Sequence, residues 1–375
     1  NVPPLRFPEF SGEWEEEQLD SIATLSKGIG ISKEQLSEDG EPCILYGELY
    51  TKYKSEIIKQ VESKTDIDCS KLKRSKANDV IIPCSGETAV DIATARCVPF
   101  DNILLGGDLN IISLHKYDGA FMSYQLNGKR KYDIARVAQG VSVVHLYGEH
   151  LKAIKTYNPS LPEQQKIAKL LSLIDERIAT QNKIIEDLKK LKSAIRKKIF
   201  SLLKDEYTKS FEINQLLDYE QPTAYIVAND EYSTDTRLTP VLTANKGFIL
   251  GYTDEKNGIY QKGACIIFDD FTMDAKYVSF PFKVKSSAIK ILTAKPNVNL
   301  RFMFEYLSHW ELKSEEHKRH YISEISPLVI ELPSKEKQNI IALLMTSLNN
   351  KLTIEEKAKI RYEVQKGYLL SQMFI

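Results

Sequence analysis

The chain has 375 residues, of which 42% are apolar, and this is enough for two or three domains with real hydrophobic cores. Its 51 basic and 51 acidic residues give a net charge of zero, which excludes a protein that binds nucleic acid through overall positive charge alone. No apolar run approaches the roughly 18 residues that cross a bilayer, and the opening NVPPLRFPEF lacks the layout of a signal peptide, so we expect a cytoplasmic protein. Five scattered cysteines without a CxxC pair indicate neither a disulfide framework nor a zinc cage.

Charge is unevenly distributed along the chain. Residues 1–160 hold 19 basic and 23 acidic residues, and residues 205–332 hold 14 and 19. Residues 161–204 hold 11 and 5, and the last 43 residues hold 7 and 4. Two acidic blocks therefore alternate with two basic ones. We place the segment boundaries at 1–158, 159–204, 205–332 and 333–375.

The first block is expected to mix strands with short helices. Strand-like runs that end in Gly or Asn predict strands over Asn78–Glu87, Asn102–Leu114 and His150–Tyr157. A long helix follows over residues 159–204, with Ser160 as its N-cap and Pro162 in its first turn.

The first long helix has an apolar seam with alternating steps of four and three residues, which is the heptad pattern of a coiled coil. Two polar residues, Gln181 and Lys192, interrupt this seam. Its apolar members are Ile167, Leu171, Ile174, Ile178, Ile185, Leu188, Ile195, Ile199 and Leu202.

The second block has the same mixed character. Strands are predicted over Gly263–Thr272 and Tyr277–Leu292, and in the latter Phe282 and Val284 alternate with Lys283 and Lys285. A second long helix closes the chain over residues 333–375, with Ser334 as its N-cap. Its seam consists of Ile341, Met345, Leu348, Leu352, Glu355, Lys359, Tyr362, Lys366, Leu369 and Met373.

The two long helices are copies of each other. Shifting the sequence by 174 residues lays Pro159–Phe200 on Pro333–Phe374 without a gap, and the polar breaks Gln181 and Lys192 fall on Glu355 and Lys366. At 1.5 Å per residue each helix extends about 60 Å, too long to be buried inside one acidic block. We therefore predict that the helices pack against each other antiparallel, as parts of two similar halves related by a pseudo-twofold axis. The alternative is two ordinary surface helices that share a heptad bias.

Several stretches of the sequence occur together in one known family. They are PPLRFPEFSGEWEEEQL near the start, PSLPEQ at Pro159–Gln164, its echo PSKEKQ at Pro333–Gln338, and the ending LLSQMF at Leu369–Phe374. In this tandem pattern the chain resembles the specificity subunit of a type I DNA restriction-modification system over nearly its whole length. The run DFTMDAKYVSFPFKVKSSAIKIL in the second block is also similar to one class of target-recognition domain. Lys337 departs from the pattern, in which glutamate is common.

The resemblance implies an α+β protein in which two mixed α/β target-recognition domains are separated by two long antiparallel coiled-coil helices. Each domain would read one half of a bipartite double-stranded DNA target, and the helices would dock two methyltransferase subunits and, through them, restriction subunits. The chain itself would be neither an enzyme nor a holder of cofactor or metal. S-adenosylmethionine and ATP would be used by the partner subunits.

Candidate DNA contacts in the first block lie in two polar stretches. The loop Cys84–Ala89 offers Ser85, Glu87 and Thr88 to base edges, and an ordinary polar turn is the alternative. The turn-forming Asn127-Gly128 precedes a basic triplet suited to phosphate contact, with a solvated charge run as its alternative. The triplet is Lys129, Arg130 and Lys131.

Candidate contacts in the second block are more dispersed. The basic cluster at residues 317–320 contributes Lys318 and Arg319, and its two histidines lack a third ligand at a spacing that would indicate a metal site. The remaining candidates are Lys246, Thr272, Lys276, Lys283 and Lys285. Sequence cannot separate residues that read bases from those that position phosphates.

Enzyme motifs are weak. NPSL at Asn158 differs in its last two positions from the catalytic signature of adenine methyltransferases, Gly28-Ile-Gly30 lacks a third glycine, and no GxxxxGK[ST] motif occurs. Asp269 and Asp270 have the character of a strand terminus. Besides the DNA-recognition hypothesis, two alternatives stay open: a coiled-coil adaptor that binds only proteins, suggested by the acidic blocks, and a stand-alone methyltransferase or nuclease.

Overall fold

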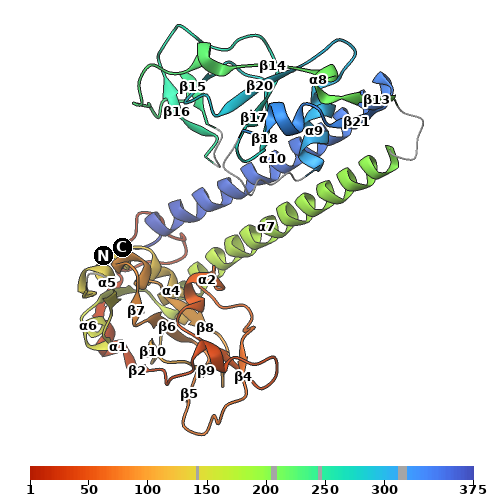
Figure 1. Ribbon diagram of the computed structural model, residues 1–375. Helices are drawn as coiled ribbons and strands as arrows, with labels where there is room; N and C mark the ends of the chain where they lie inside the picture. Colours follow the sequence, from red (N-terminus) through yellow and green to blue (C-terminus); the bar gives the residue numbers. More distant parts are fainter. Residues whose placement is uncertain (141–142, 204–208, 244–246, 311–318) are drawn as a thin grey trace. The chain divides into compact units, whose positions relative to one another are not determined.

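The computed structural model describes residues 1–140, 143–203, 209–243, 247–310 and 319–375. The chain forms two compact units (Figure 1). Unit 1 consists of Asn1–Lys183 with Lys357–Ile375, and unit 2 of Ile184–Glu356. In the described ranges no helix has both the length and the apolar character to span a membrane. The division differs from the four predicted segments, because each unit takes one half of each long helix.

Unit 1 is built on a four-stranded antiparallel sheet with the strand order β2-β10-β6-β8. The central strand β6 is wholly buried, and helix α4 packs against β8 and β6. The elements of this layer are β2 (Ala23–Lys27), β6 (Asp79–Pro83), β8 (Arg96–Val98), β10 (Leu109–Leu114) and α4 (Gly119–Asn127).

Smaller sheets and helices complete unit 1. Two sheets have two antiparallel strands each, β1 with β12 and β7 with β11. A further sheet has the strand order β4-β3-β9-β5, in which β3 and β9 pair parallel. The strands are β1 (Glu15–Gln18), β3 (Glu41–Ile44), β4 (Lys64–Thr65), β5 (Lys73–Arg74), β7 (Ser85–Gly86), β9 (Leu104–Leu105), β11 (Val144–His145) and β12 (Lys155–Asn158). The short helices are α1 (Leu19–Ile22), η1 (Lys33–Gln35), α2 (Glu48–Thr51), α3 (Ala89–Ile92), α5 (Lys131–Val137) and α6 (Gly148–Lys152).

Unit 2 repeats this plan. Its four-stranded sheet has the order β14-β20-β17-β18, with β17 wholly buried as β6 is, and helix α9 packs against β18 as α4 packs against β8. β13 pairs with β21 as β1 pairs with β12, and β15 pairs parallel with β19 as β3 pairs with β9. The strands are β13 (Lys209–Glu212), β14 (Leu217–Glu220), β15 (Thr239–Leu242), β16 (Ile249–Thr253), β17 (Cys265–Asp269), β18 (Ala275–Val278), β19 (Lys283–Val284), β20 (Ile289–Ala294) and β21 (Val329–Leu332). The helices are α8 (Ile213–Leu216), η2 (Pro222–Tyr225), α9 (Leu300–His309) and η3 (Tyr321–Ile325).

Several predicted strands are divided in the structure. Asn102–Leu114 becomes β9 and β10 in different sheets, because Gly106 and Gly107 lead to Asp108, whose φ of 57° turns the chain. Tyr277–Leu292 becomes the end of β18, β19 and the start of β20, with Pro281 in the first break. The prediction for His150–Tyr157 was wrong at its start, where helix α6 runs to Lys152.

The two long helices, α7 (Leu161–Leu203) and α10 (Lys335–Gln372), pack side by side within each unit (Figure 1). In unit 1 the start of α7 meets the end of α10, since Ile167 and Leu171 share a core cluster with Met373. In unit 2 the end of α7 meets the start of α10, since Phe200 shares a cluster with Ile341. The pairing is therefore antiparallel in both units. Every predicted seam residue from Ile167 to Ile199 and from Ile341 to Met373 is buried or half-buried.

One glutamine at the start of each long helix joins it to its unit. Gln164 donates from Nε2 to the carbonyl of Pro159 at 2.8 Å and accepts the N–H of Asp118, the N-cap of α4, at 2.9 Å. Gln338 makes the same two bonds, to Pro333 at 2.9 Å and from Asn299, the N-cap of α9, at 2.8 Å. Both side chains are buried. The same hydrogen bonds thus fix the helix entry twice.

The polar break at Lys366 is explained by an ion-pair cluster in unit 1. Its ammonium lies 2.5 Å from Glu56 Oε2 and 2.7 Å from Asp175 Oδ1, and Tyr124 donates to Asp175 at 2.6 Å. Glu56 comes from the loop between α2 and β4, Asp175 from α7 and Tyr124 from α4. The cluster therefore ties both long helices to the sheet region.

In unit 2 the equivalent place is taken by Glu305 of α9, whose side chain is wholly buried. It accepts hydrogen bonds from Arg196 of α7, at 2.7 Å to Nη2, and from Asn349 of α10, at 3.3 Å to Nδ2. Lys192, the counterpart of Lys366 in the first helix, lies near the same carboxylate, and burial lowers the pKa of this lysine. The polar breaks at Lys192 and Lys366 are thus positions where the sheet region meets the helix pair.

We expect Lys366→Met to destabilise unit 1 by about 3 kcal/mol, because it leaves two buried carboxylates without their cation. Lys357→Met is the matched control on the same helix and in the same unit, because its side chain is exposed, and it should change stability by less than about 0.5 kcal/mol. Urea unfolding followed by circular dichroism measures both. Equal losses in the two variants would contradict the role given to Lys366.

The deficit of Lys366→Met should also depend on pH. Burial raises the pKa of Glu56 above its ordinary value of 4.5, with Lys366 opposing the shift. Because the folded protein binds this proton more tightly, protonation of Glu56 contributes its whole stabilisation at pH values below the pKa of Glu56 in the unfolded chain. The contribution is lost as pH rises through the pKa of Glu56 in the folded protein. Without Lys366 the folded pKa rises further, so we expect a smaller deficit at about pH 5 than at about pH 8.

Candidate nucleic-acid interface

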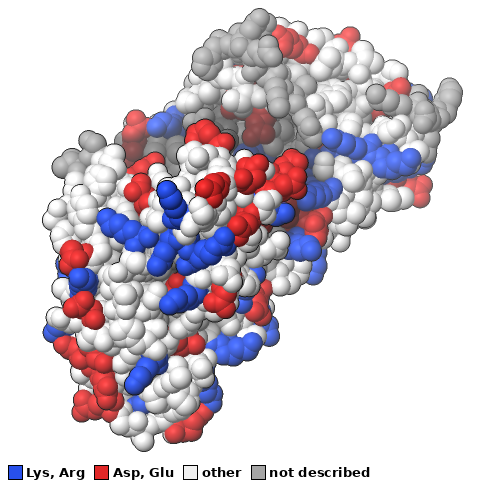
Figure 2. All heavy atoms as spheres, turned by 90° about the horizontal axis from the view of Figure 1, so that it is seen from below, with Lys and Arg blue, Asp and Glu red and all other residues white. Residues whose placement is uncertain are grey.

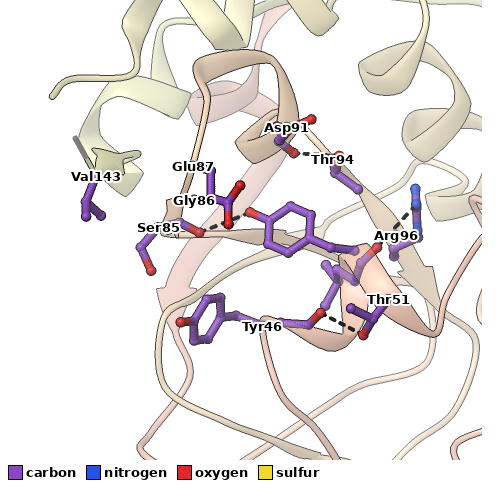
Figure 3. A pocket seen from close by; sticks show the side chains of 12 residues that line it. Tyr46, Thr51, Ser85, Gly86, Glu87, Asp91, Thr94, Arg96 and Val143 are labelled. Atoms are coloured by element: carbon purple, nitrogen blue, oxygen red, sulfur yellow. Dashed lines mark hydrogen bonds between the residues drawn. The ribbon is translucent and has the colours of Figure 1, made fainter. Parts of the chain in front are cut away.

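The stretch after β6 in unit 1 lies at the rim of a cavity of about 700 Å³ (Figure 3). Instead of a free loop, Ser85 and Gly86 form the short strand β7, which pairs with β11. Tyr50 lines this cavity, and its hydroxyl donates to the carbonyl of Ser85 at 3.0 Å. Burial raises the pKa of Tyr50, so its hydroxyl keeps its proton. The cavity is lined by Tyr46, Gly47, Leu49, Tyr50, Thr51, Ser85, Gly86, Glu87, Asp91, Thr94, Arg96 and Val143.

The three predicted residues of this stretch have different roles. Glu87 is exposed at the cavity rim, and the Ser85 hydroxyl donates to Asp108 at 3.3 Å. Thr88 caps helix α3: its Oγ1 accepts from the N–H of Asp91 at 3.1 Å and donates to the Asp91 carboxylate at 2.6 Å. Ser85 and Glu87 are therefore brought together at one opening, whereas Thr88 shapes the turn behind them.

The basic triplet of unit 1 divides in the same way. Lys129 is exposed and Lys131 half-buried at the start of α5. Arg130 donates to the carbonyl of Ile375 at 3.0 Å, pairs with Asp133 and lies 5.3 Å from the centre of the Tyr157 ring. Arg130 therefore anchors the chain end within unit 1, which argues against its predicted phosphate contact.

In unit 2 the equivalent of the Ser85 stretch follows β17. Asp269 closes this strand by accepting the N–H groups of Phe271 and Thr272, as expected for a strand terminus, and Thr272 is exposed. The Arg319 guanidinium lies 6.0 Å from the centre of the Phe271 ring and 3.5 Å from Ser287 Oγ. The turn after β17, the turn before β20 and Arg319 are thus neighbours.

The predicted lysines of unit 2 are placed unequally. Lys285 is exposed, and Lys276 is half-buried beside Asp274 at 3.2 Å. Lys283 is a correction: its side chain is 4% exposed, and its ammonium donates to the carbonyl of Asn257 at 2.7 Å and pairs with Glu255 at 2.7 Å. Strand alternation had indicated an exposed face, but both residues of β19 are buried, so the face that carries Lys283 is covered as well. Lys246 and Lys318 lie outside the described residues.

Sequence reasoning missed the buried pair of Lys290 and Asp270. Their side chains are each 1% exposed, 3.3 Å apart, and Asp270 also accepts the N–H of Tyr321 at 2.8 Å. The signal was a lysine within the apolar run of β20. Among the described residues no group of three His, Cys, Asp or Glu side chains is placed to hold a metal ion.

The surface charge is mixed. On the face drawn in Figure 2, lysine and arginine side chains form small groups with carboxylates beside them. This agrees with the net charge of zero and leaves the exposed polar loops as the positions where selective contacts can be made.

Comparison with known proteins gives a consistent family. The family model for the type I restriction modification DNA specificity domain matches residues 11–190 and 205–364. The specificity subunit of the type I restriction enzyme EcoR124I/EcoR124II of Escherichia coli is 39% identical over 178 residues, which is 42% of this chain and 43% of that protein. The chain therefore matches less than half the length of this relative. A second relative, named as the MjaX specificity subunit of Methanocaldococcus jannaschii, is 23% identical over 99% of this chain and 95% of its own length.

Solved structures share the fold. The crystal structure of the type I restriction-modification S subunit from M. genitalium superposes with a TM-score of 0.67 at 17% identity, covering 100% of this chain and 99% of that one. A chain from a structure described as underlying complex assembly and conformational transition of the type I R-M system gives a TM-score of 0.57 at 12% identity, covering 99% of each.

We expect Lys283→Met to destabilise unit 2 by about 3 kcal/mol, because Glu255 loses its buried cation. Lys285→Met, two residues away and exposed, should change stability by less than about 0.5 kcal/mol. Urea unfolding of the two variants separates a structural lysine from a surface lysine. A stable Lys283→Met protein with weakened DNA binding would restore the original prediction for this residue.

Proposed function

The chain belongs to the DNA specificity subunits of type I restriction-modification systems, and we propose that each of its units reads one half of a bipartite duplex target. The observation that supports this is that the two units repeat the same four-stranded sheet but differ in the turn that follows the equivalent central strand. The turn after β6 and the turn after β17 leave equivalent central strands, yet one offers Ser85 and Glu87 and the other Thr272. Equal scaffolds with different loops suit two sites that recognise different base sequences.

We assign base reading to the exposed side chains of these turns. In unit 1 the Glu87 carboxylate, at the cavity rim, would accept hydrogen bonds from exocyclic amines, such as cytosine N4 in the major groove. In unit 2 Thr272 offers a hydroxyl, and Arg319 offers a guanidinium of the kind that binds guanine O6 and N7. Lys129, Lys131, Lys276 and Lys285 are assigned to phosphates, where they fix position without reading sequence.

The antiparallel helices serve in this proposal as the ruler between the two reading units. Readers on one face of a duplex must be about one helical turn apart, roughly 34–36 Å, and two helices of about 60 Å are stiff enough and long enough to set that separation. The repeat of 174 residues suits a pseudo-twofold arrangement, in which the two half-sites are read in opposite directions.

Catalysis is assigned to partner subunits. Two methyltransferase subunits would bind the outer faces of the helix pair and supply adenine methylation with S-adenosylmethionine, and restriction subunits would join through them, in the cytoplasm where the DNA lies. The two acidic blocks carry 19 basic against 23 acidic residues and 14 against 19, net charges of −4 and −5. The isolated chain should therefore bind DNA weakly, with much of the phosphate contact made by partners.

Mapping of methylated adenines in DNA modified by the reconstituted complex tests the proposal. We expect one bipartite motif, with Glu87→Ala relaxing a single half-site by about tenfold in the preference for its cognate base. Glu38→Ala, which also removes an exposed carboxylate of unit 1, is the matched control and should leave the motif unchanged. If Glu87→Ala loses selectivity in both half-sites, or in neither, the assignment of one half-site to each unit is contradicted. A gel shift of the complex that prefers no duplex would favour the protein-only adaptor.

A further inference from the structure

The sheets of the two units end differently at one edge. In unit 1 the outer edge of β8 is covered by the chain's own residues 55–59. Cys97 of β8 donates its N–H to the carbonyl of Glu56 at 2.8 Å, and its carbonyl accepts the N–H of Ile58 at 3.0 Å. This forms a parallel bridge between Ile57 and Cys97. Residues 55–59 therefore act as an added edge strand, which we call the edge segment.

The edge segment also fills the space between sheet and helices. Ser55 donates to Asp175 of α7 at 3.1 Å, Lys59 pairs with Glu176 of α7 at 3.0 Å, and Ile57 packs into the cluster that contains Phe121 of α4. Its glutamate reaches the ammonium of Lys366. One short extended segment thus contacts β8, α4, α7 and α10 together.

In unit 2 strand β18 takes the place of β8, but among the described residues its outer edge is unpaired. Tyr277 lies opposite Ile266 as Cys97 lies opposite Val80, so the same register directs the backbone N–H and C=O of Tyr277 outward. Within the ranges that the structure describes, no strand or isolated bridge pairs with this outer edge. A groove of about 630 Å³, formed by residues of α9 and α10, has Tyr277 of this strand in its lining.

The groove has an apolar wall and a basic rim. Leu300, Ala342 and Leu343 line it, and the Leu343 side chain is 71% exposed. Arg301 stacks 4.4 Å from the centre of the Tyr277 ring. Its Nε has no hydrogen-bond partner within the described chain and lies 3.9 Å from Glu305 Oε1. Lys335 lies at the rim and is exposed. An extended segment with an apolar side chain and a carboxylate would suit this wall and rim.

We propose that the methyltransferase subunit adds an extended, acidic and apolar segment to the outer edge of β18, in the groove formed with α9 and α10. The segment would pair with Tyr277 by strand addition, place an apolar side chain against Leu343, and bring a carboxylate to Arg301. The inference rests on the proposed function, because it takes its partner from there. It goes further by assigning a partner-binding site to the sheet edge of unit 2, whereas the equivalent edge of unit 1 is paired with its own edge segment.

Hydrogen exchange of the full chain, alone and with the methyltransferase subunit of the same system, tests the backbone pairing. We expect the amide of Tyr277 to exchange at least roughly tenfold more slowly in the complex, because strand addition protects it. Cys97 in β8 is the internal control, since its N–H is already bonded in the free chain. Unchanged exchange at Tyr277 in an assembled complex would overturn the inference.

A pair of variants tests the side-chain contacts. Leu343→Asp should weaken binding of the methyltransferase subunit at least roughly tenfold, whereas Val364→Asp, on the same helix, 67% exposed and outside the groove, should not. Both positions are exposed, so circular dichroism and melting should match the unmodified chain. Equal binding by the two variants would overturn the groove assignment.

The outcomes separate the two proposals. A wild-type complex that methylates a bipartite target while β18 stays unprotected refutes this inference and leaves the proposed function standing. A complex that forms and protects β18 but modifies no bipartite target refutes the proposed function instead. Failure of the two subunits to associate refutes both.

Discussion

The two long helices depend on buried polar contacts with the sheet regions. Lys366 is neutralised by Glu56, and Arg196 reaches Glu305, so that a charge on each long helix finds its partner on the neighbouring sheet region. A buried charge that loses its partner costs several kcal/mol, so the helices gain little by pairing before the sheet region has formed. Helix pairing and sheet folding in each unit are therefore one event. It also requires chain segments far apart in sequence, since residues 161–183 and 357–375 both belong to unit 1.

This dependence explains which parts of the two units are alike. Gln164 and Gln338 make the same pair of bonds, because a change at either would leave a helix-capping N–H without its acceptor in a buried place. The exposed side chains in the turns after β6 and β17, such as Glu87 and Thr272, have no such constraint. They can differ in length and chemistry without cost to the scaffold, which is the condition for two reading sites on one architecture.

The sequence predicted the features that are periodic or repeated, namely both long helices, their seam and the antiparallel pairing. It could not predict contacts that join distant residues. Nothing near Lys366 in sequence indicates that Glu56 would neutralise it, so the polar break read only as an interruption of the heptads. Lys283 was misplaced for a related reason, because its partner Glu255 belongs to another hairpin. In the candidate interface the polar stretch at Ser85 was found from its composition, but the capping role of Thr88 and the anchoring role of Arg130 follow only from their hydrogen bonds.

The open edge of β18 shows how the chain can keep an unpaired strand without associating with itself. Exposed edges pair readily with other chains unless they are short or carry charge. β18 has only four residues, Lys276 lies on it, and Arg301 covers the ring of Tyr277 beside it. Positive charge along this edge disfavours a second copy of the same edge, since like charges would meet, while it favours a segment with carboxylates. In unit 1 the backbone of the corresponding edge is already paired with the chain's own edge segment. The two units therefore share one edge position on a common scaffold. In unit 1 this position is filled by a segment of the same chain, and in unit 2 it is available to a segment of a partner subunit.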